Sequence, residues 1–133
     1  MQLVIAYIAS VVVFLALDFV ALTQVIKPHF ESKIGDWLLD SPRYGPAAVF
    51  YLFYVAGVIY FVVNPALSQD WSWARVFLTG AFLGALAYGT YEFTNLATLT
   101  RWSWSQVALD FTWGAVLTGV VGSAGVFAAR LWA

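Results

Sequence analysis

Long runs of apolar residues, separated by short polar stretches, dominate the pattern along this chain of 133 residues. A helix needs about 20 apolar residues to cross the hydrocarbon core of a membrane. Four runs reach that length, and we expect membrane-spanning helices at about residues 2–26, 46–67, 74–99 and 105–131. Strands are not expected, because no segment alternates polar and apolar residues over the roughly ten residues that a barrel strand needs. The pattern predicts one all-α, polytopic membrane domain over residues 1–133.

Residues at the ends of these runs fit the predicted boundaries. Lys27-Pro28 is expected to end the first helix, because proline has no N–H for the helical hydrogen-bond ladder. Pro46 suits the first turn of the second helix, where that N–H is not needed. The N-terminal apolar run is too long for a cleaved signal peptide, so we keep it as a helix. Tryptophan favours membrane interfaces, and six tryptophans fall at predicted boundaries: Trp37, Trp71, Trp73, Trp102, Trp104 and Trp132.

The first linker, residues 27–45, is longer than the others and allows two interpretations. Phe30, Ile34, Trp37 and Leu38 recur in it at helical spacing. This is typical of a short amphipathic helix that lies in the membrane interface. The alternative is an ordinary polar loop anchored by its tryptophan.

Composition narrows the class of protein. Hydrophobic residues make up 62% and charged residues 10%, against about 45–50% and 25% in a soluble domain. The chain has no cysteine and one histidine, which excludes disulfides, cysteine-ligated metals and multi-histidine metal sites. Its net charge of −1, with the basic residues spread out, offers no patch for nucleic acid. We expect the lipid bilayer as the main partner, with no metal and no cofactor.

Basic residues are divided unequally between the two predicted membrane faces. The first and third linkers carry Lys27, Lys33, Arg43 and Arg101, whereas the opposite face carries Arg75 and Arg130. Cytoplasmic segments are enriched in Lys and Arg. We therefore expect the first and third linkers in the cytoplasm and both termini outside.

Three acidic residues, Asp18, Glu92 and Asp110, lie inside predicted membrane helices. Each is nine residues from Lys27 or Arg101, which is roughly 13 Å along a helix. The half-thickness of the hydrocarbon core is about 15 Å, so all three are predicted at one depth. An ionised carboxylate there costs about 2.5–3.5 kcal/mol on insertion scales. We expect at least one carboxyl to be protonated, to share a proton or to hold a cation.

On the third and fourth predicted helices, small residues lie on the same helix face as the acid. The third and fourth helices have a tight connection, so Glu92 and Asp110 are expected to approach each other. The two faces are Gly80, Gly84, Tyr88, Glu92 and Asn95, and Asp110, Gly114, Thr118 and Gly122. The candidate ligand- or ion-binding residues are Asp18, Glu92, Asn95, Asp110, Tyr51, Tyr54, Tyr88 and Tyr91. The alternative is that these acids only hydrogen-bond neighbouring helices and fix their packing.

The same residues carry a family resemblance. The matching blocks are Leu15-Ala16-Leu17-Asp18, Phe50-Tyr51-Leu52-x-Tyr54, Tyr88-Gly89-Thr90-Tyr91-Glu92-Phe93-Thr94-Asn95-Leu96-Ala97-Thr98-Leu99 and Asp110-x-x-Trp113-Gly114. Over nearly its whole length the chain resembles a bacterial membrane-protein family known as domain of unknown function 2177. That family usually has Asp-Leu where this chain has Glu92-Phe93. The resemblance implies four membrane helices in a bacterial inner membrane and brings no activity.

Three functions follow as hypotheses. The first is a small bundle whose acidic site binds or passes a proton, a cation or a small amphiphilic ligand, as a homo-oligomer. The second is an accessory or assembly subunit of a larger membrane complex. The third is an enzyme acting on lipids or isoprenoids, with a carboxyl pair as acid and base. The chain has no recognisable phosphate-binding or cofactor motif, so an enzyme is the least favoured of the three.

Overall fold

The computed structural model describes residues 1–41 and 43–132, and within them the chain is helical and has no strand. The elements are α1 (Gln2–Ala21), the π-helical turn η1 (Leu22–Ile26), α2 (Lys27–Ile34), the 3-10 turn η2 (Gly35–Trp37), α3 (Tyr44–Val58), the π-helical turn η3 (Ile59–Val63), α4 (Asn64–Gln69), α5 (Trp73–Thr98) and α6 (Trp104–Trp132). This confirms the all-α class that the apolar runs predict.

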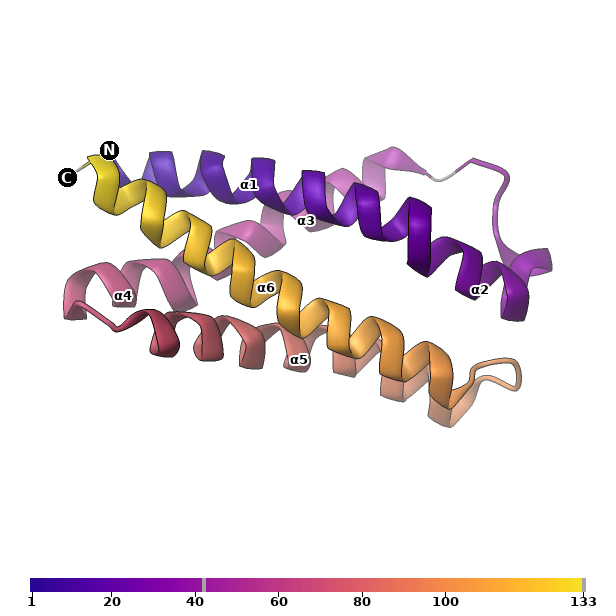
Figure 1. Cartoon of the computed structure of the whole chain (residues 1–133). Coiled ribbons are helices and arrows are strands. Elements are labelled where there is room, and N and C mark those ends of the chain that lie inside the picture. The colour runs from indigo at the N-terminus through magenta and orange to yellow at the C-terminus, as the bar shows by residue number, and fades with distance from the viewer. Residues whose placement is uncertain (42, 133) are drawn as a thin grey trace.

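The helices form an elongated bundle in which both chain ends lie at the same end (Figure 1). A hydrogen bond from Gln2 Nε2 to the carbonyl oxygen of Ala129, 3.0 Å long, joins the first and last helices there. Helix α6 crosses the bundle and packs mainly on α5 and α1. Helix α3 lies behind α1 and α6 in this view, and α4 continues it to the turn that leads into α5 (Figure 1).

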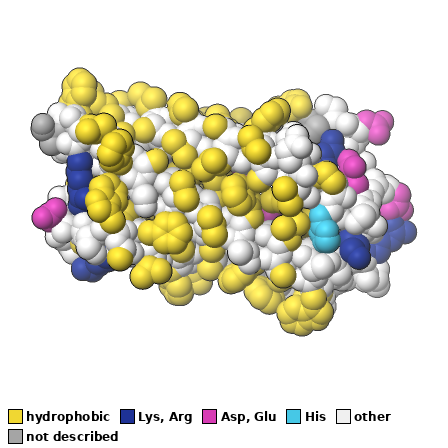
Figure 2. Space-filling model, viewed as in Figure 1, with side chains coloured by type: hydrophobic (Ala, Val, Ile, Leu, Met, Phe, Trp, Pro, Cys, Tyr) yellow, Lys and Arg dark blue, Asp and Glu magenta, His cyan; other side chains and the backbone are white. Residues whose placement is uncertain are grey.

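The outer surface of the bundle matches a lipid environment. Among the described residues, three helical segments are long and apolar enough to cross a membrane: Gln2–Trp37, Tyr44–Gln69 and Trp104–Trp132. Helix α5 has 26 residues, but polar side chains in its second half make it less apolar than these three. Hydrophobic side chains cover the middle of the molecule and charged ones gather at its two ends (Figure 2). Such a continuous apolar surface marks an integral membrane protein.

The expectation that the first helix ends at Lys27-Pro28 is wrong. The helical rod continues to Trp37, and the N–H of Lys27 bonds to the carbonyl oxygen of Leu22, five residues back, within η1. A proline ring inside a regular α-helix clashes with a carbonyl in the preceding turn. The wider π-helical turn relieves that clash and lets the helix go on. Turn η3 has the same position relative to Pro65.

The first linker is partly helical, as one of its two interpretations expects, but α2 prolongs α1 instead of forming a separate helix. Ile34 is only 5% exposed and packs with Phe30 against Trp102, so α2 binds to the bundle itself. Beyond it, the guanidinium of Arg101 bonds to Asp36 at the charged end of the molecule. This ion pair ties the first linker to the connection between α5 and α6.

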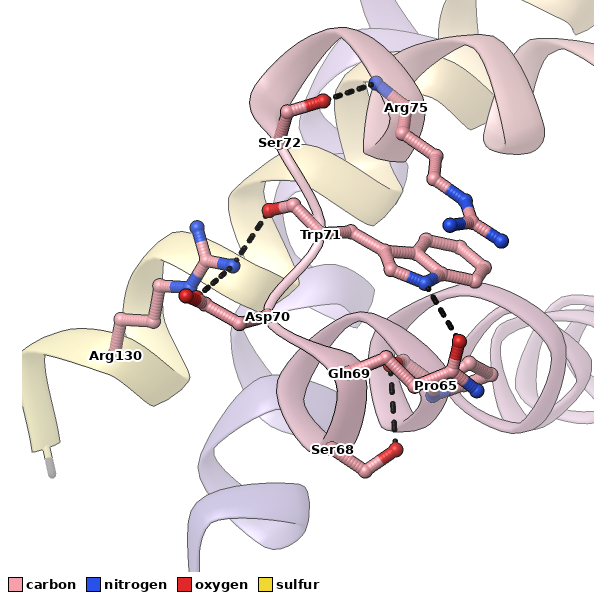
Figure 3. Close-up of polar contacts among 8 residues, drawn as sticks. All are labelled: Pro65, Ser68, Gln69, Asp70, Trp71, Ser72, Arg75 and Arg130. Atoms are coloured by element: carbon pink, nitrogen blue, oxygen red, sulfur yellow. Dashed lines mark hydrogen bonds and ion pairs between the residues drawn. The ribbon is translucent and has the colours of Figure 1, made fainter.

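At the opposite end of the bundle, Arg130 near the end of α6 contacts the turn between α4 and α5 (Figure 3). Its Nη2 donates a hydrogen bond of 2.9 Å to the carbonyl oxygen of Trp71 and lies 3.5 Å from Asp70 Oδ1. Asp70 has a φ of 50°, the left-handed conformation that reverses the chain after α4. Ser72 then caps α5 by accepting from the N–H of Arg75. These contacts tie α6 to the turn between α4 and α5.

We expect Arg130→Gln to lower the free energy of unfolding by about 1 kcal/mol, because it removes the hydrogen bond to Trp71. Asp70→Asn is the matched control. The side chain of Asp70 is 98% exposed, so its ion pair is screened and contributes little. Denaturant titration in detergent micelles would measure both variants. An equal loss in the two would contradict the assignment to the Trp71 carbonyl.

Candidate intramembrane acidic site

Asp18, in the last turn of α1, is 5% exposed and faces α6. Its Oδ1 accepts a hydrogen bond of 3.2 Å from Nε1 of Trp113. No lysine or arginine among the described residues forms an ion pair with it. The ion pairs of those residues lie at the two ends of the bundle: Lys27–Glu31, Arg101–Asp36 and Arg130–Asp70. Asp18 is therefore held in place by an indole N–H and not by a cation.

Glu92, in α5, has no exposed surface. Its Oε1 accepts a hydrogen bond of 2.9 Å from Nε1 of Trp102, which lies in the connection between α5 and α6. Its Oε2 is also buried and has no hydrogen-bond partner among the described residues. Among the described residues, a hydrogen bond therefore stabilises only one of the two carboxyl oxygens.

Asp110, in α6, connects the other two acids. Its carboxyl lies beside Glu92 and also faces Asp18 across the bundle. Among the described residues, no group of three His, Cys, Asp or Glu side chains could hold a metal ion. The arrangement is a row from α5 through α6 to α1, with Asp110 in the middle.

Two of these carboxyls line one cavity of about 370 Å³ between α1, α3, α5 and α6. Its lining residues are Asp18, Leu22, Ala47, Phe50, Tyr51, Ala87, Tyr88, Tyr91 and Asp110. The cavity thus combines two acids, three phenols and an apolar wall, and its described lining contains no basic side chain. Volumes of 300–1,000 Å³ are typical of small-molecule sites.

A second cavity, of about 270 Å³, adjoins the first between α1 and α3. Ala47 and Tyr51 belong to the walls of both. The remaining lining residues of the second cavity are almost entirely apolar: Val11, Phe14, Leu15, Tyr44, Ala48, Leu52 and Val55. An acidic pocket therefore continues into an apolar groove.

The other candidate residues lie near the acidic cavity but outside its wall. The hydroxyl of Tyr54 forms a hydrogen bond of 2.7 Å with Thr118 Oγ1, and its ring packs near that of Tyr88. Asn95 is half-buried beside Tyr91 and one turn beyond Glu92. Tyr54 therefore supports the wall, whereas Asn95 lies toward the charged end of α5.

Two tryptophans donate hydrogen bonds to the acids, and the sequence did not predict either of them as a site residue. Trp102 is 8% exposed and bonds to Glu92, although its place at a helix boundary suggested an interfacial anchor. Trp113 bonds to Asp18. The position of Trp113 could have indicated this role, because it lies inside a predicted helix whereas the other six tryptophans lie at predicted helix ends. The burial of Trp102 depends on α2 covering it, which apolar periodicity did not indicate.

We expect Trp102→Phe to lower the free energy of unfolding by about 1–3 kcal/mol, because both oxygens of Glu92 would then lack a donor among the described residues. Trp104→Phe is the control, since Trp104 is 71% exposed two residues away. Thermal unfolding of the two variants in the same detergent would measure the difference. Equal midpoints would show that the indole N–H of Trp102 does not stabilise the buried carboxyl.

Comparison with protein families shows which family the chain matches. The family described as "Predicted membrane protein (DUF2177)" matches residues 3–127. No curated protein and no solved structure matches the chain. The match covers all of the residues that form the acidic site.

Proposed function

Since the chain belongs to the family described as a predicted membrane protein (DUF2177), we propose that its acidic cavity binds the positively charged head of a small amphiphile within the bacterial inner membrane. The observation that carries this proposal is the shared wall: Asp18 of α1 and Asp110 of α6 line one cavity, with no basic side chain among its described lining residues. The family match and the apolar surface support the membrane setting.

The chemistry of the wall favours a cation over an anion or a neutral polar group. Two carboxyls offer negative charge, and the rings of Tyr51, Tyr88 and Tyr91 offer π faces. Ammonium groups are attracted to both, and the attraction is stronger where water is excluded. A bound cation would also offset part of the cost of placing carboxylates in the membrane.

The adjoining groove favours an amphiphile over a bare ion. A head bound between Asp18 and Asp110 can place an alkyl tail past Ala47 and Tyr51, along the apolar walls of α1 and α3. Burial of each CH₂ group contributes roughly 0.8 kcal/mol. Affinity is then expected to depend on both the head charge and the tail length.

The charged ends of the bundle support one orientation of the chain in the membrane. Lys27, Lys33, Arg43 and Arg101 lie on the linkers at the end nearer the three acids, while Arg75 and Arg130 lie at the other. The excess of basic residues supports an orientation with the first end in the cytoplasm and both termini outside. The acidic cavity would then open within the cytoplasmic half of the membrane.

The test uses the full chain in lipid nanodiscs, with empty nanodiscs subtracted. Decyltrimethylammonium is the probe, decyldimethylamine oxide is the matched ligand of no net charge, and tetramethylammonium is the head without a tail. We expect saturable binding of the first, at least tenfold weaker binding of the second, and the weakest binding of the third. Equal binding of the cationic and neutral ligands would contradict an acidic head site.

A further inference from the structure

An apolar groove of about 330 Å³ lies between the second half of α1, the turn η1 and the first half of α6. Its lining residues are Leu17, Val20, Ala21, Val25, Ile26, Leu109 and Trp113. Val20 and Val25 are 58% and 50% exposed, so the groove opens on the outer surface of the bundle. Two of its side chains belong to the π-helical turn η1, a feature that proteins often place at functional sites.

Polar side chains lie directly beyond one end of this groove. His29 follows Val25 of the groove by one helical turn. On α6, Ser105 precedes Leu109 of the groove by the same distance. Nε2 of His29 and Oγ of Ser105 lie 3.1 Å apart and join the two helices at that end. Ser103 Oγ lies 3.0 Å from Ser105 Oγ and adds a second hydroxyl, so the apolar groove ends at a cluster of hydrogen-bonding groups.

This cluster lies at the level of the lipid headgroups. Lys27 and Glu31, the first exposed charged side chains at this end of the apolar run, flank His29 in the sequence. In Figure 2 the histidine lies between the apolar middle of the molecule and basic side chains at its charged end. From Ile26 to Leu17 the groove extends roughly 13 Å into the membrane, and the half-thickness of the hydrocarbon core is about 15 Å. The groove thus matches the depth of one leaflet.

The face of α2 that carries His29 also carries a positive charge. Lys33 lies one turn beyond His29, is exposed and forms no ion pair with a carboxylate among the described residues. Lys27 pairs with Glu31 on the opposite face of the same helix. The next acid along the chain is bound by Arg101. Lys33 is therefore available to a negatively charged group near the hydroxyls of the cluster.

We propose that this groove binds an anionic phospholipid of the bilayer, with its phosphate at His29, Ser105 and Lys33 and one acyl chain between α1 and α6. Phosphate oxygens accept hydrogen bonds from a hydroxyl, an imidazole N–H and an ammonium group, which are the donors that the cluster offers. A groove as deep as one leaflet fits an acyl chain, whereas a transmembrane partner helix would need contacts across both leaflets. The inference does not depend on the proposed function, since no residue of this site lines the acidic cavity.

Native mass spectrometry of the full chain, released from detergent micelles with added lipid, measures the affinity of each bound lipid. Dioleoylphosphatidylglycerol is the probe, and dioleoylphosphatidylcholine is the matched lipid with the same chains and no net charge. We expect phosphatidylglycerol to bind about fivefold more tightly, the effect of one lysine near an anionic headgroup. Equal affinities would overturn the headgroup site. Inorganic phosphate at the concentration of the lipid should not displace it, and displacement would show a site for free phosphate and overturn the inference.

Lys33→Gln removes the charge of the proposed phosphate site and should weaken phosphatidylglycerol binding about fivefold, with little change for phosphatidylcholine. Lys27→Gln is the matched control, because it makes the same change in the same helix on the opposite face. It should leave both affinities nearly unchanged. Equal losses of phosphatidylglycerol affinity in the two variants would show a general attraction between basic residues and anionic lipids, and would overturn the site.

The place of the acyl chain is tested by filling the groove. Ala21→Phe puts a large side chain on its wall and should weaken binding of both lipids at least several-fold. Ala16→Phe is the control, because Ala16 is exposed on the same helix and lies outside the lining of the groove. Lipid binding that is equally strong in these two variants would overturn the placement of the chain between α1 and α6.

Discussion

Asp18→Asn and Asp110→Asn should each weaken binding of decyltrimethylammonium about tenfold, and the double variant about a hundredfold. Each substitution keeps the size of the side chain and removes one negative charge from the wall of the acidic cavity. A tenfold change in affinity corresponds to about 1.4 kcal/mol, which is modest for an ion pair in a site from which water is excluded. The amide oxygen that Asp18→Asn introduces can still accept from Trp113, so the helix packing should be retained.

The control for this experiment is Glu31→Gln, which removes an acid whose side chain is 50% exposed and which lies far from the cavity. It should leave the affinity unchanged. Binding of decyldimethylamine oxide should change little in any of the variants, because the groove beyond Tyr51 is unaltered. If both single variants bound the cation as the unchanged protein does, the carboxyls would be packing elements. The accessory-subunit hypothesis would then gain weight.

The architecture could be predicted from the sequence because membrane thickness imposes helix length. Runs of about 20 apolar residues have few folded alternatives in lipid. The end of the first helix could not be predicted in the same way. Pro28 is a reliable helix terminator only when the preceding turn is α-helical, and here the π-helical turn Leu22–Ile26 accommodates it. Local propensity gave no indication of that wider turn.

The acidic site was partly accessible to sequence reasoning. Equal spacing from Lys27 and Arg101 predicted a common depth for the three acids, but depth does not fix the rotation of a helix about its axis. Rotation decides that Asp18 and Asp110 line the cavity while Glu92 turns toward Trp102. It depends on contacts between helices distant in the sequence, such as the 95 residues that separate Asp18 from Trp113.

The close contact of α5 and α6 is the feature on which the whole site depends, and Gly84→Ala should disrupt it. A Cβ atom at Gly84 would lie 2.2 Å from the carbonyl oxygen of Gly114 and 2.6 Å from Thr118 Oγ1. The first of these is backbone, so the helices must separate. Overpacking of this kind typically costs about 1–3 kcal/mol, and we expect a loss of about 2–3 kcal/mol in the free energy of unfolding.

Gly57→Ala, in α3, is the matched control, because a Cβ atom there meets nothing within 4 Å. Alanine favours a helix by up to about 1 kcal/mol over glycine, so this variant should be as stable as the unchanged protein or slightly more stable. Unfolding of both variants by titration with a denaturing detergent, followed by circular dichroism, measures the difference. Equal stability of the two would contradict the close approach of α5 and α6.

The same variant distinguishes a shared site from separate acids. Separation of α5 from α6 would move Tyr88 and Glu92 away from Asp110, since all three lie on the contacting faces. Gly84→Ala should therefore weaken cation binding under conditions where the protein is still folded, whereas Gly57→Ala should not. Loss of stability without loss of binding would show that the head site needs only α1 and α6, and that the α5 side of the cavity is not part of it.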